Sequence, residues 1–204
     1  MDKLTYLGHA SLCIETSEGK IIYIDPYAGD DADYERPADL ILVTHDHYDH
    51  NEISKVKNRA TDVKIITERE ALKDGAHQSF HLGFADIEAV EAGYNKFHDE
   101  TKCVGYIITL TSGVKLYVAG DTTLTPQMNT FADRNIDYAF FPMEGIYTMT
   151  PEEATIAASK VQAKHSIPYH TDANSNEINH ATVDKFTADN KFVIEKGETI
   201  NLGE

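Results

Sequence analysis

The residues from Thr44 to His50 are dense in groups that bind cations. The stretch reads Thr-His-Asp-His-Tyr-Asp-His, so three imidazoles and two carboxylates fall within seven residues. Side chains two positions apart on an extended backbone project to the same side, so His45 and His47 can hold one ion together. Asp49 and His50 can address a second ion beside the first. Zinc accepts such ligands, as do manganese and iron. The alternative is a solvated polar turn that binds no metal, which is less favoured because the spacing of the ligands is so specific.

The elements around this cluster are expected to hold it rigidly. Residues 39–44 contain the apolar run Leu-Ile-Leu-Val, which predicts a strand buried on both faces that ends where the cluster begins. Residues 49–58 are predicted to form a short helix, with Asp49 and His50 at its start. The candidate ligands therefore follow directly on a strand, where loops on a rigid scaffold usually present catalytic groups.

Helix-start signals occur twice more. Thr67 and Glu70 have the spacing of a capping box that opens a helix reaching Leu72. Residues 150–153, Thr-Pro-Glu-Glu, combine an N-cap, a proline at the first helical position and a capping glutamate, and a stripe of alanines follows. A further helix is expected at residues 182–188.

Short β-rich runs make up most of the remaining chain. We expect strands at residues 4–6, 11–15, 21–24, 86–90, 104–110, 114–118 and 166–169. No linker rich in Pro, Gly or Ser divides the chain, so a single domain over residues 1–204 is expected. Two β-rich halves flanked by helices predict two sheets packed face to face with helices outside, a four-layer α/β/β/α sandwich.

Composition limits the possible partners and the compartment. The 204 residues carry a net charge of -16 and no run of Lys and Arg, so neither nucleic acid nor an anionic membrane is an expected partner. No stretch approaches the apolar length that spans a bilayer and no signal peptide is evident, so we expect a soluble, cytoplasmic protein. Cys13 and Cys103 lack metal-ligand or redox spacing and are expected to be buried thiols.

The order His-x-His-x-Asp-His after an apolar strand resembles the signature of the metallo-β-lactamase superfamily. Four further stretches look like its compact hydrolase branch, which includes ascorbate-6-phosphate lactonase-like proteins: Leu7–Ser11, Ile24–Pro26, Tyr117–Thr122 and Tyr147–Ala154. The resemblance runs from about Leu7 to His170. It implies the four-layer sandwich and a hydrolase with two divalent metal ions, zinc being expected and manganese or iron being the alternatives.

The resemblance also implies the ligands that lie far along the chain. Asp121 matches the aspartate that bridges both metals, and His170 matches the last histidine of the second ion. His98 matches the third histidine of the first ion, with His77 and His81 as alternatives. The complete implied set of metal ligands is His45, His47, Asp49, His50, His98, Asp121 and His170.

Four other residues are expected around the ligands. Asp25 matches a family aspartate that accepts hydrogen bonds from the ligand loop. His9 either plays a similar part or is a buried core histidine. Tyr147 and Glu144 are expected to line the pocket.

The chemistry implied by this site is hydrolysis. Two ions about 3.5–4 Å apart share a water, lower its pKa and present hydroxide to a carbonyl or phosphorus atom. Asp49 is the expected catalytic residue, because it would bind the second ion and orient that hydroxide. The expected substrate is a small-molecule lactone, ester, amide or phosphoester.

The sequence is also compatible with two other functions. They are a mono-iron redox enzyme of the same fold and a non-catalytic module with a structural metal site. A nuclease is less favoured, because the chain lacks a basic tract and the room for an additional clamp domain.

Overall fold

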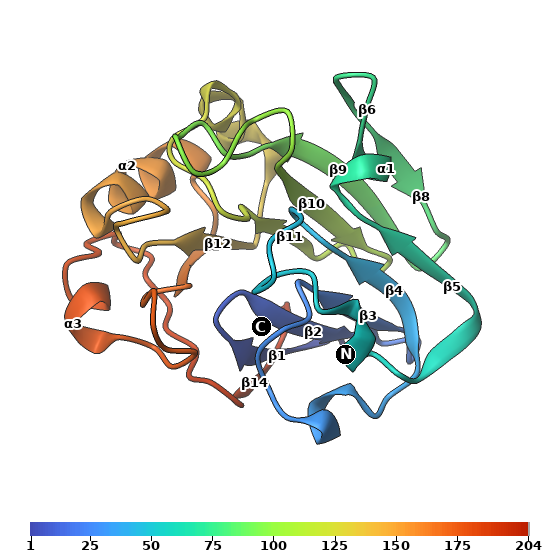
Figure 1. The fold of residues 1–204 in the computed structure, drawn as a ribbon. Helices are drawn as coiled ribbons and strands as arrows, with labels where there is room; N and C mark the ends of the chain where they lie inside the picture. Colours follow the sequence, from blue (N-terminus) through green and yellow to red (C-terminus); the bar gives the residue numbers. More distant parts are fainter. Residues whose placement is uncertain (204) are drawn as a thin grey trace.

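A computed structural model describes residues 1–203, which form two six-stranded β-sheets packed face to face (Figure 1). The first sheet has the order β14-β1-β2-β3-β4-β5, and the second has the order β13-β12-β11-β10-β9-β8. The strands of the first sheet are β1 (Lys3–Gly8), β2 (Ser11–Glu15), β3 (Ile21–Ile24), β4 (Ala38–Leu42), β5 (Arg59–Ile66) and β14 (Thr199–Asn201). Those of the second are β8 (Ser79–His81), β9 (Ala85–Glu91), β10 (Val104–Leu110), β11 (Lys115–Val118), β12 (Tyr138–Pro142) and β13 (His165–Tyr169). A small hairpin, β6 (Leu72–Lys73) and β7 (Ala76–His77), stands apart.

The core consists of three apolar layers. Alternate residues of a strand face opposite sides, so Tyr106 and Ile108 of β10 pack between the sheets while Ile107 faces outward. In β3, Ile22 and Ile24 likewise join the layer between the sheets. Both sheets are therefore buried on two faces, which explains their long apolar runs.

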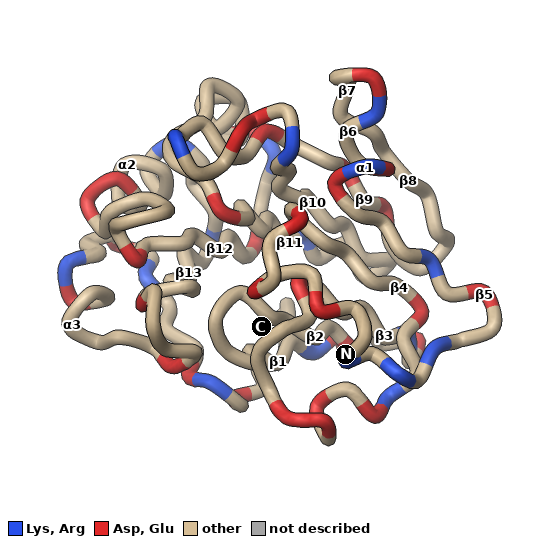
Figure 2. The backbone as a smooth tube through the Cα atoms, in the orientation of Figure 1, with Lys and Arg blue, Asp and Glu red and all other residues tan. Residues whose placement is uncertain are grey.

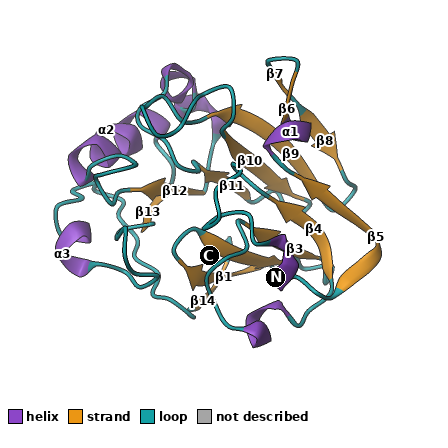
Figure 3. Ribbon diagram, in the orientation of Figure 1, coloured by secondary structure: helices purple, strands orange, loops and turns teal. Residues whose placement is uncertain are grey.

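Helical segments cover the outer faces of the two sheets (Figure 3). The second sheet is covered by α2 (Pro151–Val161) and by the 3-10 turns η3 (Pro126–Thr130) and η4 (Ala132–Arg134). The first sheet is covered by the 3-10 turns η1 (Asp31–Tyr34) and η2 (Ile53–Lys55), with Tyr34 and Val56 packed on it. The predicted four-layer sandwich is thus confirmed, although one outer layer contains short turns rather than long helices.

Two helix starts agree with the sequence prediction. α1 (Glu68–Ala71) opens with Thr67 as its N-cap, and the Glu70 carboxylate accepts a hydrogen bond from the Thr67 backbone N–H. α2 opens with Thr150 as N-cap, Pro151 at the first position and Glu153 completing the capping box. These side chains satisfy backbone N–H groups that have no partner inside the helix.

Two helix predictions are wrong. Residues 49–58 form a turn followed by η2, because Glu52 N–H donates to the Pro26 carbonyl at 2.9 Å instead of continuing a helix. The helix expected at 182–188 is α3 (His180–Val183), a single turn capped by the Asn179 side chain. Asp49 and His50 therefore lie on a turn, not at a helix start.

Acidic and basic residues are interspersed along the chain, with Asp and Glu in excess (Figure 2). Over residues 1–203, no helix combines the length and apolarity needed to cross a membrane.

Candidate metal centre

Four strand ends meet at one edge of the sandwich. Asp25 follows β3, His45 follows β4, Asp121 follows β11 and His170 follows β13. The two sheets approach closely here, since Val104 N–H donates to the Thr44 carbonyl at 2.9 Å. Residues far apart in the sequence are thereby placed side by side.

Gly120 permits this close approach. Its φ is +66°, and a Cβ at this position would lie 2.9 Å from the Val104 carbonyl oxygen and 3.0 Å from Thr44 Cβ. Glycine is the residue that fits such a backbone without a steric cost. The Gly-Asp-Thr motif thus brings Asp121 against the loop that starts at Thr44.

The first cluster comprises His45, His47 and His98, whose candidate ligand atoms all lie within 4.8 Å of one another. His45 Nε2 is 3.0 Å from His47 Nδ1, so both rings present a nitrogen to the same point. Gly93 makes the tight turn that delivers His98, because its φ is +90° and a Cβ would lie 2.7 Å from the His98 carbonyl oxygen. His98 Nδ1 in turn donates to the Tyr147 carbonyl at 3.1 Å, leaving Nε2 free to face the cluster.

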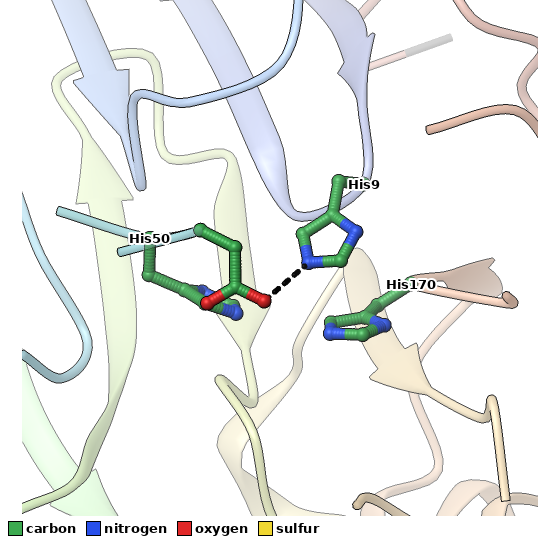
Figure 4. Close-up of side chains that lie close together, drawn as sticks. His9, His50 and His170 are labelled. Carbon is green, nitrogen blue, oxygen red and sulfur yellow. Dashed lines mark ion pairs between the residues drawn. The ribbon is translucent and has the colours of Figure 1, made fainter. Parts of the chain in front are cut away.

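The second cluster comprises Asp49, His50 and His170, and His9 belongs to the same group of ligand atoms within 4.8 Å (Figure 4). Asp121 lies between the two clusters. Its Oδ2 is 3.4 Å from the Nε2 atoms of three histidines, namely His98 of the first cluster and His50 and His170 of the second. One carboxylate oxygen is therefore shared by both clusters.

A buried carboxylate orients the ligand loop. Asp25 is fully buried and accepts hydrogen bonds from Thr44 N at 2.7 Å, Thr44 Oγ1 at 2.7 Å and His50 Nδ1 at 2.9 Å. The Thr44 hydroxyl is also 3.1 Å from His45 Nδ1. Such partners fix the tautomer of a ligating histidine and direct its other nitrogen to the metal. The role expected for Asp25 agrees with this geometry, whereas Thr44 was not foreseen.

Burial and neighbouring charges shift the pKa values of these groups in different directions. Burial lowers the pKa of His45 and of His98, which favours the neutral imidazole that binds metals. Burial opposes a charge on His50 too, but the carboxylates of Asp121 and Asp25 outweigh it and raise its pKa well above the usual value. For Asp121, the neighbouring His170 and His50 outweigh burial and hold the pKa well below its usual range.

Several buried ligand atoms have no hydrogen-bond partner within residues 1–203. They include His50 Nε2 and Asp121 Oδ1, although buried polar atoms are almost always paired. A cation at each cluster would satisfy them. The donor set of imidazole and carboxylate thus fits a pair of divalent ions.

A cavity of about 650 Å³ opens over both clusters. Its walls include Tyr48, Phe97 and Tyr147, which are exposed aromatic side chains, together with metal-facing residues such as Asp49. Tyr147 thus lines the pocket as expected. Glu144 does not line it, because its carboxylate is used to accept the backbone N–H groups of residues 146–148.

The structure brings all seven implied ligand residues together at this edge. His77 and His81, the alternatives to His98, lie on β7 and β8 and belong to none of the candidate metal groups found in residues 1–203. His81 is exposed and pairs with Asp86 at 2.8 Å. Sequence reasoning left the role of His9 open and overlooked Phe97, because neither residue lies in the short motif that marks the site.

Comparisons with known proteins agree with the fold and identify the family. The family model described as a beta-lactamase superfamily domain matches residues 3–170. A UPF0173 metal-dependent hydrolase from Ligilactobacillus salivarius is 31% identical over 185 residues, covering 82% of this chain and 84% of the relative. Another from Bacillus cytotoxicus is 31% identical over 228 residues and covers 98% and 100%. The chain belongs to the metallo-β-lactamase superfamily, within its UPF0173 family of metal-dependent hydrolases.

Solved structures give the same fold. Igni18, a metallo hydrolase from the hyperthermophilic archaeon Ignicoccus hospitalis, is 27% identical with a TM-score of 0.78, covering 98% of this chain and 97% of that one. An isothiocyanate hydrolase from Delia radicum gut bacteria is 19% identical with a TM-score of 0.72, covering 98% and 99%, and supports the fold alone.

Proposed function

We propose that this protein is a binuclear metal-dependent hydrolase that cleaves a lactone, ester, amide or phosphoester bond in a small molecule. The observation that carries the proposal is the position of Asp121 Oδ2, 3.4 Å from histidine nitrogens of both clusters. A carboxylate shared in this way suits two ions held side by side. Zinc is the expected metal, with manganese and iron as alternatives that accept the same ligands.

The bound ions would supply a water activated at neutral pH and would stabilise the negative charge of the transition state. The residues of the chain then have distinct tasks. His45, His47 and His98 would hold the first ion; Asp49, His50 and His170 would hold the second; Asp121 would bind both.

Asp49 is the catalytic residue in this proposal. Asp49 and Asp121 both line the cavity, but the Asp49 side chain is 22% exposed, whereas Asp121 is only 3% exposed. A carboxylate at the boundary between the second cluster and the cavity can accept a hydrogen bond from the attacking water and orient it. Asp49 would therefore act both on the ion and on the nucleophile.

The cavity suggests the kind of substrate. Phe97 and Tyr147 meet edge to face with ring centroids 4.8 Å apart and form an apolar wall beside the ligands. No Lys or Arg lines this cavity among the described residues, so an anionic group on the substrate would have to be held by the metal ions. The sequence resemblance to ascorbate-6-phosphate lactonase-like proteins makes lactones the first class to assay.

The test uses metal-loaded protein and a panel of lactones, esters, amides and phosphoesters. We expect hydrolysis of at least one class, its loss on chelation and its return on adding zinc or manganese. Asp49→Ala should lower kcat by at least about 100-fold, the lower end of what a positioned acid or base contributes. Asp86→Ala, an exposed carboxylate on β9, is the control. Full activity of the Asp49→Ala protein with both ions bound would refute the assigned role.

A redox enzyme with one iron is the second candidate. The clustering of His50, His170 and Asp49 argues against it, because these residues would have little to coordinate beside a single ion at the first cluster. Oxygen consumption by the iron-loaded protein would favour this alternative.

A cytoplasmic location is part of the proposal. Cys13 and Cys103 are both free and buried, as suits a reducing compartment.

A further inference from the structure

His9 is a buried histidine directed at the second cluster. Its side chain is only 5% exposed, and its Nε2 lies 3.3 Å from Asp49 Oδ2, the contact dashed in Figure 4. Its ring also lies on that of His170, with centroids 3.8 Å apart. The His9 side chain therefore lies among the candidate ligands of the second cluster, although His9 is close to the N-terminus in the sequence.

The backbone at His9 holds an unfavourable conformation. Its φ is +51°, a region that residues other than glycine seldom adopt and that costs of order 1–3 kcal/mol. Three hydrogen bonds maintain it: His9 N–H donates to the Asn176 carbonyl at 3.1 Å, and the His9 carbonyl accepts from His170 N–H and Tyr6 Oη–H, both at 2.9 Å. The surrounding fold thus fixes where this imidazole points.

The nitrogen that faces the second cluster lacks a hydrogen-bond partner. His9 Nε2 is among the buried polar atoms without a hydrogen-bond partner in residues 1–203, although it lies 3.3 Å from Asp49 Oδ2. A core histidine kept for stability would satisfy this nitrogen. The arrangement is the one expected when the partner is a cation.

The spacing supports the same reading. Two neighbouring nitrogen or oxygen ligands of one zinc ion, each about 2.0–2.1 Å from it and about 90–120° apart in angle, are roughly 2.9–3.6 Å from each other. The distance of 3.3 Å between His9 and Asp49 lies in this range, as do the distances of 3.4 Å from Asp121 to His50 and to His170.

We propose that His9 Nε2 is an additional ligand of the second ion, beside Asp49, His50, Asp121 and His170. The second ion would then have five protein ligands and the first would have four. The first ion keeps more open positions, so the substrate is expected to bind there. This inference rests on the proposed pair of ions but does not depend on which bond is cleaved.

The test compares His9→Asn with the wild type. Asparagine tolerates a positive φ, so this substitution removes the imidazole without adding backbone strain. Metal binding is measured against a competing chelator with zinc as the probe. Loss of residues that merely support a ligand costs about 10–100-fold in metal affinity, so loss of a ligand should cost about 100-fold or more at one site and leave the other unchanged. His81→Asn, the same change at an exposed histidine, should bind like the wild type.

A second measurement separates a ligand from a residue that only positions Asp49. In the cobalt-loaded protein, proton NMR should show a paramagnetically shifted ring N–H of His9 that is absent from His9→Asn. Identical shifted signals in the two proteins, or equal zinc affinities, would overturn the inference. If the wild type itself binds a single ion, the proposed metal pair fails together with this inference, whereas two bound ions without a His9 signal refute the inference alone.

Discussion

Asp25→Asn is the substitution that most sharply tests how the ligand loop works. Asp25 Oδ2 accepts from both Thr44 Oγ1 and His50 Nδ1, while its Oδ1 accepts from Thr44 N. Asparagine keeps the size of the side chain and tolerates the φ of +44° at this position. The asparagine amide has one oxygen, so it can replace only one of the two accepting oxygens of Asp25. If that oxygen keeps the hydrogen bond from the Thr44 N–H, the NH₂ group faces His50 Nδ1.

This change should move a proton within His50. An NH₂ group opposite Nδ1 favours the tautomer in which Nδ1 accepts and Nε2 carries the hydrogen, and that Nε2 is the nitrogen directed at Asp121. Metal affinity at the second cluster should fall by about 10–100-fold, which is about 1.4–2.8 kcal/mol. The first cluster, which relies on Thr44 rather than on this bond, should be affected less.

The assay is a chelator competition with zinc, combined with nitrogen NMR of the His50 ring in the metal-free protein at a pH above the raised pKa of His50, where the ring carries a single N–H hydrogen. We expect weakened binding of one ion together with the changed tautomer. Wild-type affinity for both ions despite the reversed tautomer would show that the tautomer set by Asp25 does not control metal binding at the second cluster, which would contradict the prediction.

Three further outcomes follow from the packing and the thiols. Gly120→Ala should destabilise the protein by about 1–3 kcal/mol more than Gly113→Ala, because both glycines have a positive φ but only Gly120 lies against neighbouring backbone. Equal decreases in the free energy of unfolding, measured with denaturant, would contradict this. Chelation should lower the thermal midpoint by roughly 10–20 °C if each of the two ions had been present at 100 times its Kd, and an unchanged midpoint would argue against bound ions. Burial raises the pKa of Cys13 to about 11 and that of Cys103 to about 12. Both thiols should therefore react slowly with iodoacetamide at pH 8 and faster as the pH rises. Rapid labelling of the folded protein at pH 8 would contradict this, because it would show that the thiols are accessible.

Local signals in the sequence predict the sandwich and the histidine-rich motif, whereas the candidate ligands far along the chain were implied by the resemblance to the superfamily. Apolar runs such as residues 104–110 mark buried strands, and the capping residues Thr67 and Thr150 mark helix starts at the observed places. The motif at residues 45–50 follows β4, and strand ends at one edge converge. Each of these signals is carried by residues close together in the sequence, so it can be recognised without knowing the fold.

The failures arise where distant segments determine the backbone. The helix predicted at 49–58 does not form because the Glu52 N–H binds the Pro26 carbonyl, a partner that no local pattern reveals. The sequence did not predict β5, because this edge strand is mostly exposed and contains polar residues, so it lacks an apolar run. His9 reaches the metal centre only through its strained backbone and its contact with His170, so a single histidine in the sequence gave no clear signal.

Anomalous diffraction from crystals of the zinc-loaded protein tests the central claim most directly. We expect two zinc peaks about 3.5–4 Å apart, one within the first cluster and one within the second, with the carboxylate of Asp121 between them. A single peak, or peaks away from Asp121, would contradict it.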